Sequence, residues 1–196
     1  MAGMLFPSKV WWLLKFYGLE HVSLLNGGFD NWLEHKYPVS SETPEIKEGN
    51  FIAVVHPEML ITFEELEKAD ESGRKPFDKF EEINILDARP VAQFRGESPE
   101  TYGFNVTPGF HVKGAKSVPV GEMITKNGLK TSAELWNALR EVGFSKEKPT
   151  IVYCSAGVQA ALLYLALNTL CIHNIRLYDG GTMEMAVRDP SLVSGR

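Results

Sequence analysis

Cysteine is scarce in this sequence, which has only Cys154 and Cys171 among its 196 residues. The two are far apart, and neither a C-x-x-C motif nor a histidine at ligand spacing accompanies them. A disulfide framework and a zinc site are therefore not expected, and nothing else in the sequence calls for a metal or a cofactor. Such sparing use of cysteine fits a reducing compartment.

Long apolar runs and runs of positive charge are absent as well. No apolar stretch approaches the roughly 20 residues that cross a bilayer, since Lys15, Gln159 and Asn168 interrupt the longest ones. The opening MAGMLFPSKVWWLLKFYG lacks the small-residue cleavage site of a signal peptide. Twenty basic residues face 25 acidic ones, for a net charge of -5, and none of the basic residues form a run that could follow a phosphate backbone. We expect a soluble protein with no membrane span and no nucleic-acid partner.

What the sequence does have is a globular composition, with 44% apolar and 23% charged residues. The length leaves room for one full domain plus extra. From about residue 51, strand-like and helix-like segments alternate, which predicts an α/β fold with a mostly parallel sheet flanked by helices on both faces. Ligands of such sheets bind beyond the carboxyl ends of the strands. The expected strands are 51–55, 83–86, 117–118, 150–153 and 175–178, and the expected helices are 62–69, 91–94, 132–142 and 158–170.

The first block, residues 1–38, is expected to contain a helix over 8–17, a strand over 21–25 and a short helix ending near His35. Its first helix is apolar nearly all round, which is typical of a helix buried on more than one side. About forty residues cannot build an independent core, so something must cover this helix. A protein partner or a second copy of the chain would do so. The residues to be covered are Trp11, Trp12 and Phe16.

Residues 39–50 are polar, contain Pro44 and Gly49, and show no periodicity, as expected of a linker. We place the domain boundary there, which leaves residues 51–196 as one complete domain.

The segment 149–170 carries the strongest chemical signal. A buried-type strand, TIVY, runs into CSAGVQ and then into the apolar helix AALLYLALNTL. Cys154 stands where the strand ends and the helix begins, and there the free N–H groups and the helix dipole lower a thiol pKa. The small residues Ser155, Ala156 and Gly157 let backbone N–H groups surround an anion. A lone cysteine is as often a small core residue, so its placement alone leaves both interpretations open.

Three motifs, in order, resemble those of the rhodanese and mercaptopyruvate sulfurtransferase family. The segment IVYCSAGVQAALLYLAL with IRLYDGG resembles the family's active loop and final strand. ILDARP with QFRGE resembles its Asp-[Ala/Ser]-Arg segment, and HVKGA with VP resembles its Gly-His-Ile-x-Gly-Ala motif. The segment SKVWWLLKFYGLEHVSLLNGGFDNWL resembles the last third of the first domain in tandem members. The resemblance implies a rhodanese-like fold, with residues 1–38 as the C-terminal remnant of a first rhodanese domain, unless a longer natural chain supplies the rest.

The resemblance also implies a double-displacement sulfur transfer. Cys154 would take the outer sulfur of thiosulfate or 3-mercaptopyruvate as a persulfide and pass it to cyanide, a thiol or a thioredoxin. Arg89 would hold the sulfonate or carboxylate of this small anionic donor, and Arg95 is a second candidate for that contact. Relatives work in mitochondria and cytosol, so either compartment is expected. The loop would cradle the sulfur with backbone N–H groups, those of Ser155, Ala156, Gly157, Val158 and Gln159.

Several positions depart from the family pattern. Ser155 and Ala156 replace both the Gly-Ser pair of mercaptopyruvate enzymes and the Arg-Lys pair of thiosulfate enzymes, so the loop does not select a donor. Gln159 stands where Thr is usual, Gln93 replaces a second arginine, and both tryptophans of the final Asp-Gly-Ser-Trp-x-Glu-Trp motif are missing. The alternative is a catalytically weak or inactive rhodanese-like module that acts as a subunit or protein-docking element.

Other residues have plainer interpretations. The loop of a dual-specificity phosphatase or arsenate reductase needs an arginine after five intervening residues, and no arginine follows Cys154 before Arg176. Asp87 is expected to accept backbone N–H groups in a turn, and His111 to order its own loop. Cys171, late on an apolar helix, is expected in the core.

Overall fold

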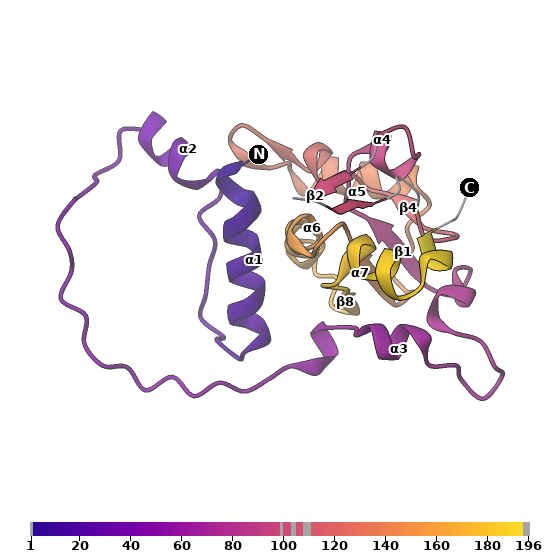
Figure 1. Ribbon diagram of the computed structural model, residues 1–196. Coiled ribbons are helices and arrows are strands. Elements are labelled where there is room, and N and C mark those ends of the chain that lie inside the picture. The colour runs from indigo at the N-terminus through magenta and orange to yellow at the C-terminus, as the bar shows by residue number, and fades with distance from the viewer. Residues whose placement is uncertain (1, 99, 103–104, 108–110, 194–196) are drawn as a thin grey trace.

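A four-stranded parallel sheet forms the centre of the computed structural model, which describes residues 2–98, 100–102, 105–107 and 111–193 (Figure 1). The strand order is β4-β1-β7-β8, so all four carboxyl ends lie at one edge. In the central pair, Asp87 lies opposite Tyr153. The strands are β1 (Asn84–Asp87), β4 (Lys116–Ser117), β7 (Thr150–Tyr153) and β8 (Ile175–Leu177).

Both central strands are buried at every position, as expected where helices cover both faces of a parallel sheet. Their side chains alternate between two clusters. Leu86 and Val152 join the cluster that contains Cys154 and α6 (Val158–Thr169), whereas Ile85 and Ile151 join the cluster on the opposite face. Cys154 therefore continues the alternation of the strand that precedes it.

The helices predicted in the main domain are present, and their bounds differ from the expected ones by at most two residues. Thr62 and Thr131 both begin helices with a capping box. No described helix has the length and apolar character needed to cross a membrane. The other helices are α1 (Ala2–Phe16), α2 (Gly28–Glu34), α3 (Phe63–Glu67), α4 (Val91–Phe94), α5 (Ser132–Glu141) and α7 (Gly181–Arg188).

Short elements that the sequence did not predict fill the loops. Two antiparallel pairs lie outside the main sheet, and four single 3-10 turns connect the larger elements. The pairs are β2 (Glu100–Tyr102) with β3 (Asn105–Thr107) and β5 (Ile124–Thr125) with β6 (Gly128–Leu129), and the turns are η1 (Pro57–Met59), η2 (Pro76–Lys79), η3 (Val120–Glu122) and η4 (Pro190–Val193).

One side of the apolar helix α1 is covered by the chain itself. It packs against α6 (Figure 1), which is buried at every position from Ala160 to Leu167 because the sheet lies on its other side. Trp11 and Trp12 are only 7% and 2% exposed. Both rings lie 6.4 Å from that of Tyr164. Packing against α6 therefore buries Trp11 and Trp12 within the chain, while a protein partner or second copy over Trp11, Trp12 and Phe16 stays a prediction.

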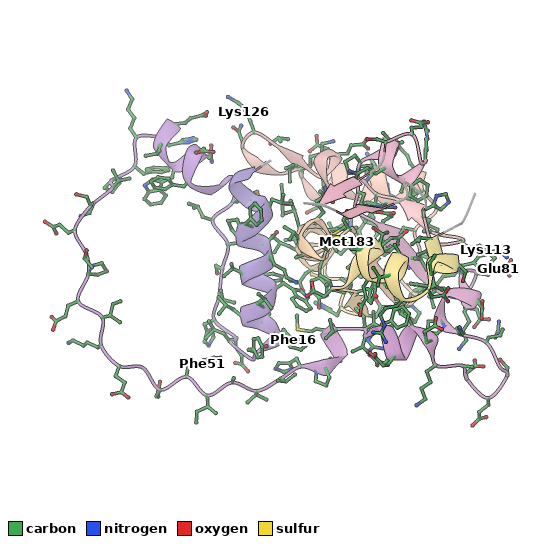
Figure 2. All side chains as sticks on the ribbon, viewed as in Figure 1. Phe16, Phe51, Glu81, Lys113, Lys126 and Met183 are labelled. Atoms are coloured by element: carbon green, nitrogen blue, oxygen red, sulfur yellow. The ribbon has the colours of Figure 1, made fainter. Side chains whose placement is uncertain are left out.

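Two predicted strands, 21–25 and 51–55, are not formed. A strand needs a neighbour for its N–H and C=O groups, and neither segment pairs with one. Residues 37–56 instead run as an extended loop without helix or strand around the outside of the molecule, where Phe51 points away from the sheet (Figures 1 and 2). Near its end, the N–H groups of Val54 and His56 donate to the carbonyls of Tyr17 and Phe16, so the segment satisfies the C-terminal end of α1.

Cys171 is exposed, which corrects its expected place in the core. Helix α6 ends at Thr169, and Cys171 takes a left-handed backbone conformation with φ of 57°. That turn reverses the chain after the helix, so the cysteine leaves the apolar face that its position in the sequence suggested.

Candidate active site

Cys154 follows β7 directly and precedes α6, as the sequence predicts. Gly157 begins the helix in a left-handed conformation, with φ of 73°. The turn places three backbone N–H groups, those of Ala156, Gln159 and Ala160, around the Cys154 sulfur, where they act to lower the pKa of its thiol. The loop therefore forms an anion cradle around Sγ. Ala160 lies one residue beyond the predicted set.

The electrostatic prediction for Cys154 is wrong in sign. Its side chain is 1% exposed, and burial raises the pKa of the thiol above its ordinary value of 9.0, with a smaller contribution from the Asp87 charge. The three N–H groups lower the pKa but do not outweigh burial. At neutral pH the resting group is thus a thiol. Its depth comes from the cluster of buried residues around it, which joins parts of the chain that are far apart and is not visible in the local sequence.

The start of α7 packs against the Cys154 loop. The N–H of Thr182 donates to the Cys154 carbonyl at 2.9 Å, and that of Met183 donates to the Ser155 carbonyl at 3.2 Å. Gly181, with φ of 60°, approaches so closely that a Cβ there would lie 2.4 Å from the Cys154 oxygen. Only glycine permits this contact. The segment after β8 therefore fixes the backbone of the nucleophile.

Two buried hydroxyl groups lie in this region without a partner among the described residues. Ser155 and Thr182 are 1% and 0% exposed, and neither Ser155 Oγ nor Thr182 Oγ1 has a hydrogen-bond partner there. A buried hydroxyl left unpaired costs about 1 to 3 kcal/mol, so such groups call for an explanation. Sequence reasoning missed Thr182, whose only signal is its place after Asp-Gly-Gly, at a position where the family motif has tryptophan.

Below the loop lies a buried polar network. Arg89 Nη2 is 2.6 Å from Asp87 Oδ2, and Arg89 Nε is 3.0 Å from both carboxylate oxygens. The Tyr153 hydroxyl accepts the N–H of Val112 at 3.2 Å. Burial, then the Asp87 charge, raises the pKa of Tyr153 well above its usual value. Asp87 also accepts the backbone N–H of Arg89, which confirms its predicted turn role, while donor binding by Arg89 stays a prediction.

The α4 segment lies beside this network. His111 Nδ1 is 2.8 Å from the Phe94 carbonyl and its ring stacks on Phe94 at 3.9 Å, so it ties its own loop to α4 as predicted. Arg95 is exposed at the end of α4, 3.9 Å from Glu97. Within the described part of the chain the ion-pair partner of Arg95 is Glu97 and not a residue of the Cys154 loop, and its role as a donor contact stays a prediction.

A cavity of about 210 Å³ adjoins the loop. It lies beyond the carboxyl ends of β1 and β4, where the fold predicts ligands to bind, and it reaches α6 through Gln159. No three His, Cys, Asp or Glu side chains gather as metal ligands in the described residues. The other lining residues are Ala88, Pro90, Val91, Pro119, Val120, Gly121 and Glu122.

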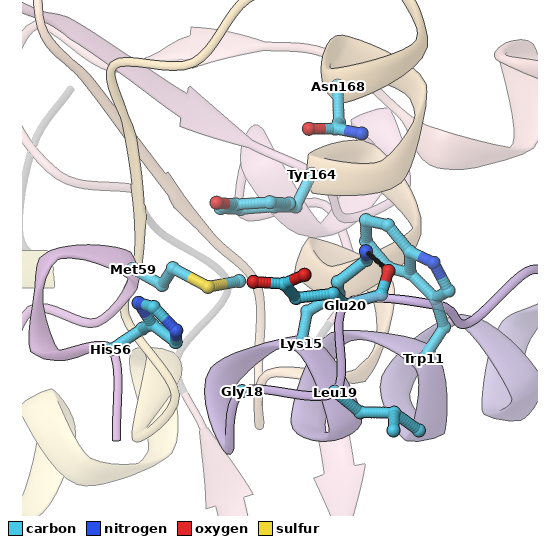
Figure 3. A pocket seen from close by; sticks show the side chains of 9 residues that line it. All are labelled: Trp11, Lys15, Gly18, Leu19, Glu20, His56, Met59, Tyr164 and Asn168. Atoms are coloured by element: carbon cyan, nitrogen blue, oxygen red, sulfur yellow. Dashed lines mark hydrogen bonds between the residues drawn. The ribbon is translucent and has the colours of Figure 1, made fainter. Parts of the chain in front are cut away.

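A second cavity, of about 310 Å³, lies between the C-terminal half of α1 and the later turns of α6 (Figure 3). Tyr164 and Asn168 face it from α6, and Lys15 Nζ, which also lines it, donates a hydrogen bond to the carbonyl of Glu20. The residues described as lining this cavity do not include any of the Cys154 loop, so the two sites are distinct. Burial raises the pKa of Tyr164 to about 12.

Known proteins resemble this chain over nearly its whole length. The protein mpst-1 of Caenorhabditis elegans is 38% identical over 98% of this chain, and the 3-mercaptopyruvate sulfurtransferase of Escherichia coli K12 is 35% identical over 95%. The thiosulfate sulfurtransferase of Bos taurus is 30% identical over 96%. The chain spans 60%, 63% and 61% of these three relatives.

The fold also resembles that of solved structures. The crystal structure of the Tum1 protein from Saccharomyces cerevisiae superimposes with a TM-score of 0.83 at 25% identity, covering 99% of this chain and 67% of that one. Residues 64–186, which contain β1, β7, the Cys154 loop and most of α7, match the family described as the rhodanese-like domain. The parallel sheet flanked by helices agrees with this match, and this chain belongs to the rhodanese-like domain family.

Proposed function

We propose that this chain is a sulfurtransferase domain that carries a sulfane sulfur on Cys154 as a persulfide. The observation that supports this most is the set of three backbone N–H groups on the Cys154 sulfur, at the carboxyl edge of the sheet and beside a cavity. Fixed donors around a sulfur stabilise negative charge without reorganisation. The names of the E. coli and B. taurus relatives supply the reaction class.

In the first step the Cys154 thiol loses its proton and the thiolate attacks the outer sulfur of the donor. With thiosulfate, a sulfur–sulfur bond forms, the original sulfur–sulfur bond breaks, and sulfite leaves with the electron pair. With 3-mercaptopyruvate, a carbon–sulfur bond breaks and the enolate of pyruvate leaves and is protonated. In the second step cyanide or a thiolate, including that of a thioredoxin, attacks the outer sulfur and releases the Cys154 thiolate.

The residues around Cys154 have distinct proposed roles. The N–H groups of the loop hold the outer sulfur, and the buried hydroxyls of Ser155 and Thr182 donate to it once it is bound. Arg89 and Arg95 remain the proposed contacts for the charged end of the donor. The loop from Cys154 to Gln159 has no basic side chain, so we leave thiosulfate and 3-mercaptopyruvate as equal candidates.

Intact-mass spectrometry after exposure to each donor tests this proposal. A gain of one sulfur is expected in the wild type and in Cys171→Ser, and no gain in Cys154→Ser. Subsequent cyanide should remove the added mass and release thiocyanate. Absence of the added sulfur from the wild type with both donors would refute the activity.

A non-catalytic docking module is the second candidate, and an exposed apolar surface on α1 and α2 favours it. Phe6, Val10, Phe29 and Leu33 are 65%, 55%, 60% and 47% exposed. This surface faces away from α6 and would suit a protein partner or a second copy of the chain. Sedimentation velocity of the wild type and of Phe6→Ser/Phe29→Ser tests it, with a dimer or larger species expected only for the wild type.

A further inference from the structure

Helix α1 reaches the cysteine loop through one ion pair. Lys9 Nζ donates a hydrogen bond to Asp179 Oδ1, across 170 positions of sequence. The same ammonium lies 4.7 Å from the ring centre of Trp12, and Trp12 is itself fixed between Phe16 and Tyr164. Lys9 is thus only 17% exposed along its side chain, and its charge is held in one place.

Asp179 lies directly against the turn that begins α6. A Cβ on Gly157 would lie 1.8 Å from Asp179 Oδ1, the oxygen that binds Lys9, and 3.0 Å from the Asp179 carbonyl oxygen. Asp179 follows β8 and precedes Gly181, whose backbone touches the Cys154 carbonyl. Lys9, Asp179 and Gly157 therefore form one continuous contact from α1 to the loop.

The sign of the charge at this contact bears on anion binding. Gly157 sits within the loop that cradles an anion, and that loop contains no lysine or arginine. A bare carboxylate beside it would repel an incoming anion, by an interaction that is several-fold stronger near a protein surface than in bulk water. Lys9 cancels this charge, so a residue outside the family-matched segment 64–186 supplies the compensating cation.

We propose that Lys9 is a positioning residue that lets the Cys154 loop accept an anionic sulfur donor, by neutralising Asp179 and holding it against Gly157. The inference rests on the proposed sulfurtransferase function for its biological meaning. Its physical content, selection for anions at Cys154, is measurable without any sulfur transfer.

Alkylation of the full chain by iodoacetate, an anion, and by iodoacetamide, its neutral counterpart, measures this selection. Peptide mass spectrometry gives the rate at each cysteine, and the iodoacetate to iodoacetamide ratio at Cys154 is the readout. The variant Lys9→Met keeps the apolar stem of the side chain over Trp12 while removing the charge. We expect it to lower the ratio by about fivefold at low ionic strength, and less at high salt.

Matched controls separate charge from structure. Lys15→Met removes a lysine of the same helix that binds the Glu20 carbonyl at the second cavity, and should leave the ratio at Cys154 unchanged. Lys9→Arg and the double variant Lys9→Met/Asp179→Asn should restore it. The exposed Cys171 is an internal reference whose ratio should stay constant in every variant.

The outcomes distinguish this inference from the proposed function. A reduced ratio that Asp179→Asn restores supports the role of Lys9 even where no persulfide forms. An unchanged ratio in Lys9→Met overturns it even where sulfur transfer is normal, as does a Cys154 that resists both reagents while Cys171 reacts. Where transfer is measurable, Lys9→Met should raise the KM for thiosulfate more than it lowers kcat.

Discussion

Arg89 Nη2 lies 2.6 Å from Asp87 Oδ2, and neither side chain is exposed to solvent. The pair stands at the end of β1, where Asp87 is in register with Tyr153, the residue before Cys154. The Asp87 charge also raises the pKa of Tyr153. The nucleophile therefore follows a strand whose last residue is paired with the strand end that carries the buried ion pair, so the geometry of the loop and the integrity of the pair are coupled.

Removing the arginine of this pair should be strongly destabilising. Arg89→Met leaves the Asp87 carboxylate buried without its cation, and breaking a buried pair in this way costs about 3 to 5 kcal/mol. Arg188→Met, which breaks the exposed contacts to Glu64 and Glu184, should have a much smaller effect. Urea denaturation measures both. The double variant Asp87→Leu/Arg89→Met should recover part of the loss, and equal losses in the Arg89 and Arg188 variants would contradict the argument.

Much of the fold could be predicted because burial on both faces leaves a clear pattern. The four-residue buried strands and the mostly apolar α6 are of this kind, and their bounds agree with the sequence to within one or two residues. The same signal failed at 51–55. Phe51 and Val54 are apolar yet 54% and 59% exposed, because apolar residues alone do not show whether a neighbouring strand exists.

The candidate site also has parts that the sequence predicts and parts that it does not. Cys154 and most of its N–H cradle could be found because strand, loop and helix follow one another in the chain. Lys9, Asp179 and Thr182 could not, since contacts between α1, α7 and the loop join residues far apart in sequence. The direction of the Cys154 pKa shift was mispredicted for a related reason: dipole and loop are local features, whereas the burial that dominates depends on packing with distant parts of the chain.

The crowding of Asp179 against the loop predicts a specific cost at Gly157. Gly157→Ala introduces a Cβ at positive φ and 1.8 Å from Asp179 Oδ1, whereas Gly73→Ala introduces one at nearly the same φ, 80°, with nothing within 4 Å. The control should lose about 1 to 2 kcal/mol from backbone strain. The Gly157 variant should lose more and form little persulfide. Thermal or urea denaturation with intact-mass analysis measures this, and similar losses in both variants would show that Asp179 does not press on the loop.

The raised pKa of Cys154 sets the pH dependence of its reactivity and of stability. Only the thiolate attacks, so alkylation of Cys154 by iodoacetamide should keep rising with pH through 9.0 and beyond. In the unfolded chain the Cys154 thiol ionises near its ordinary pKa of 9.0, whereas in the folded chain it ionises only at a higher pH. The free energy of unfolding should therefore fall as pH rises above about 9.0. Cys154→Ser should remove that part of the decline. A rate that levels off below pH 8 would instead indicate a thiolate stabilised by the loop.

Thr182 should separate folding from sulfur chemistry, because its hydroxyl is buried without a partner among the described residues and its N–H binds the Cys154 carbonyl. Thr182→Val keeps the shape and removes the hydroxyl, so the free energy of unfolding should stay the same or rise by up to about 2 kcal/mol, while the persulfide should decay faster.

Thr182→Ser keeps the hydroxyl and loses a methyl group, so it should cost about 1 kcal/mol and preserve the persulfide. Urea denaturation and the loss of the added sulfur mass over time give the two readouts for each variant. The hydroxyl is identified as a donor to the bound sulfur if the valine variant is the more stable of the two and yet has the shorter-lived persulfide. A purely structural role of Thr182 would not separate stability from persulfide lifetime in this way. Equal persulfide lifetimes in the two variants would exclude it.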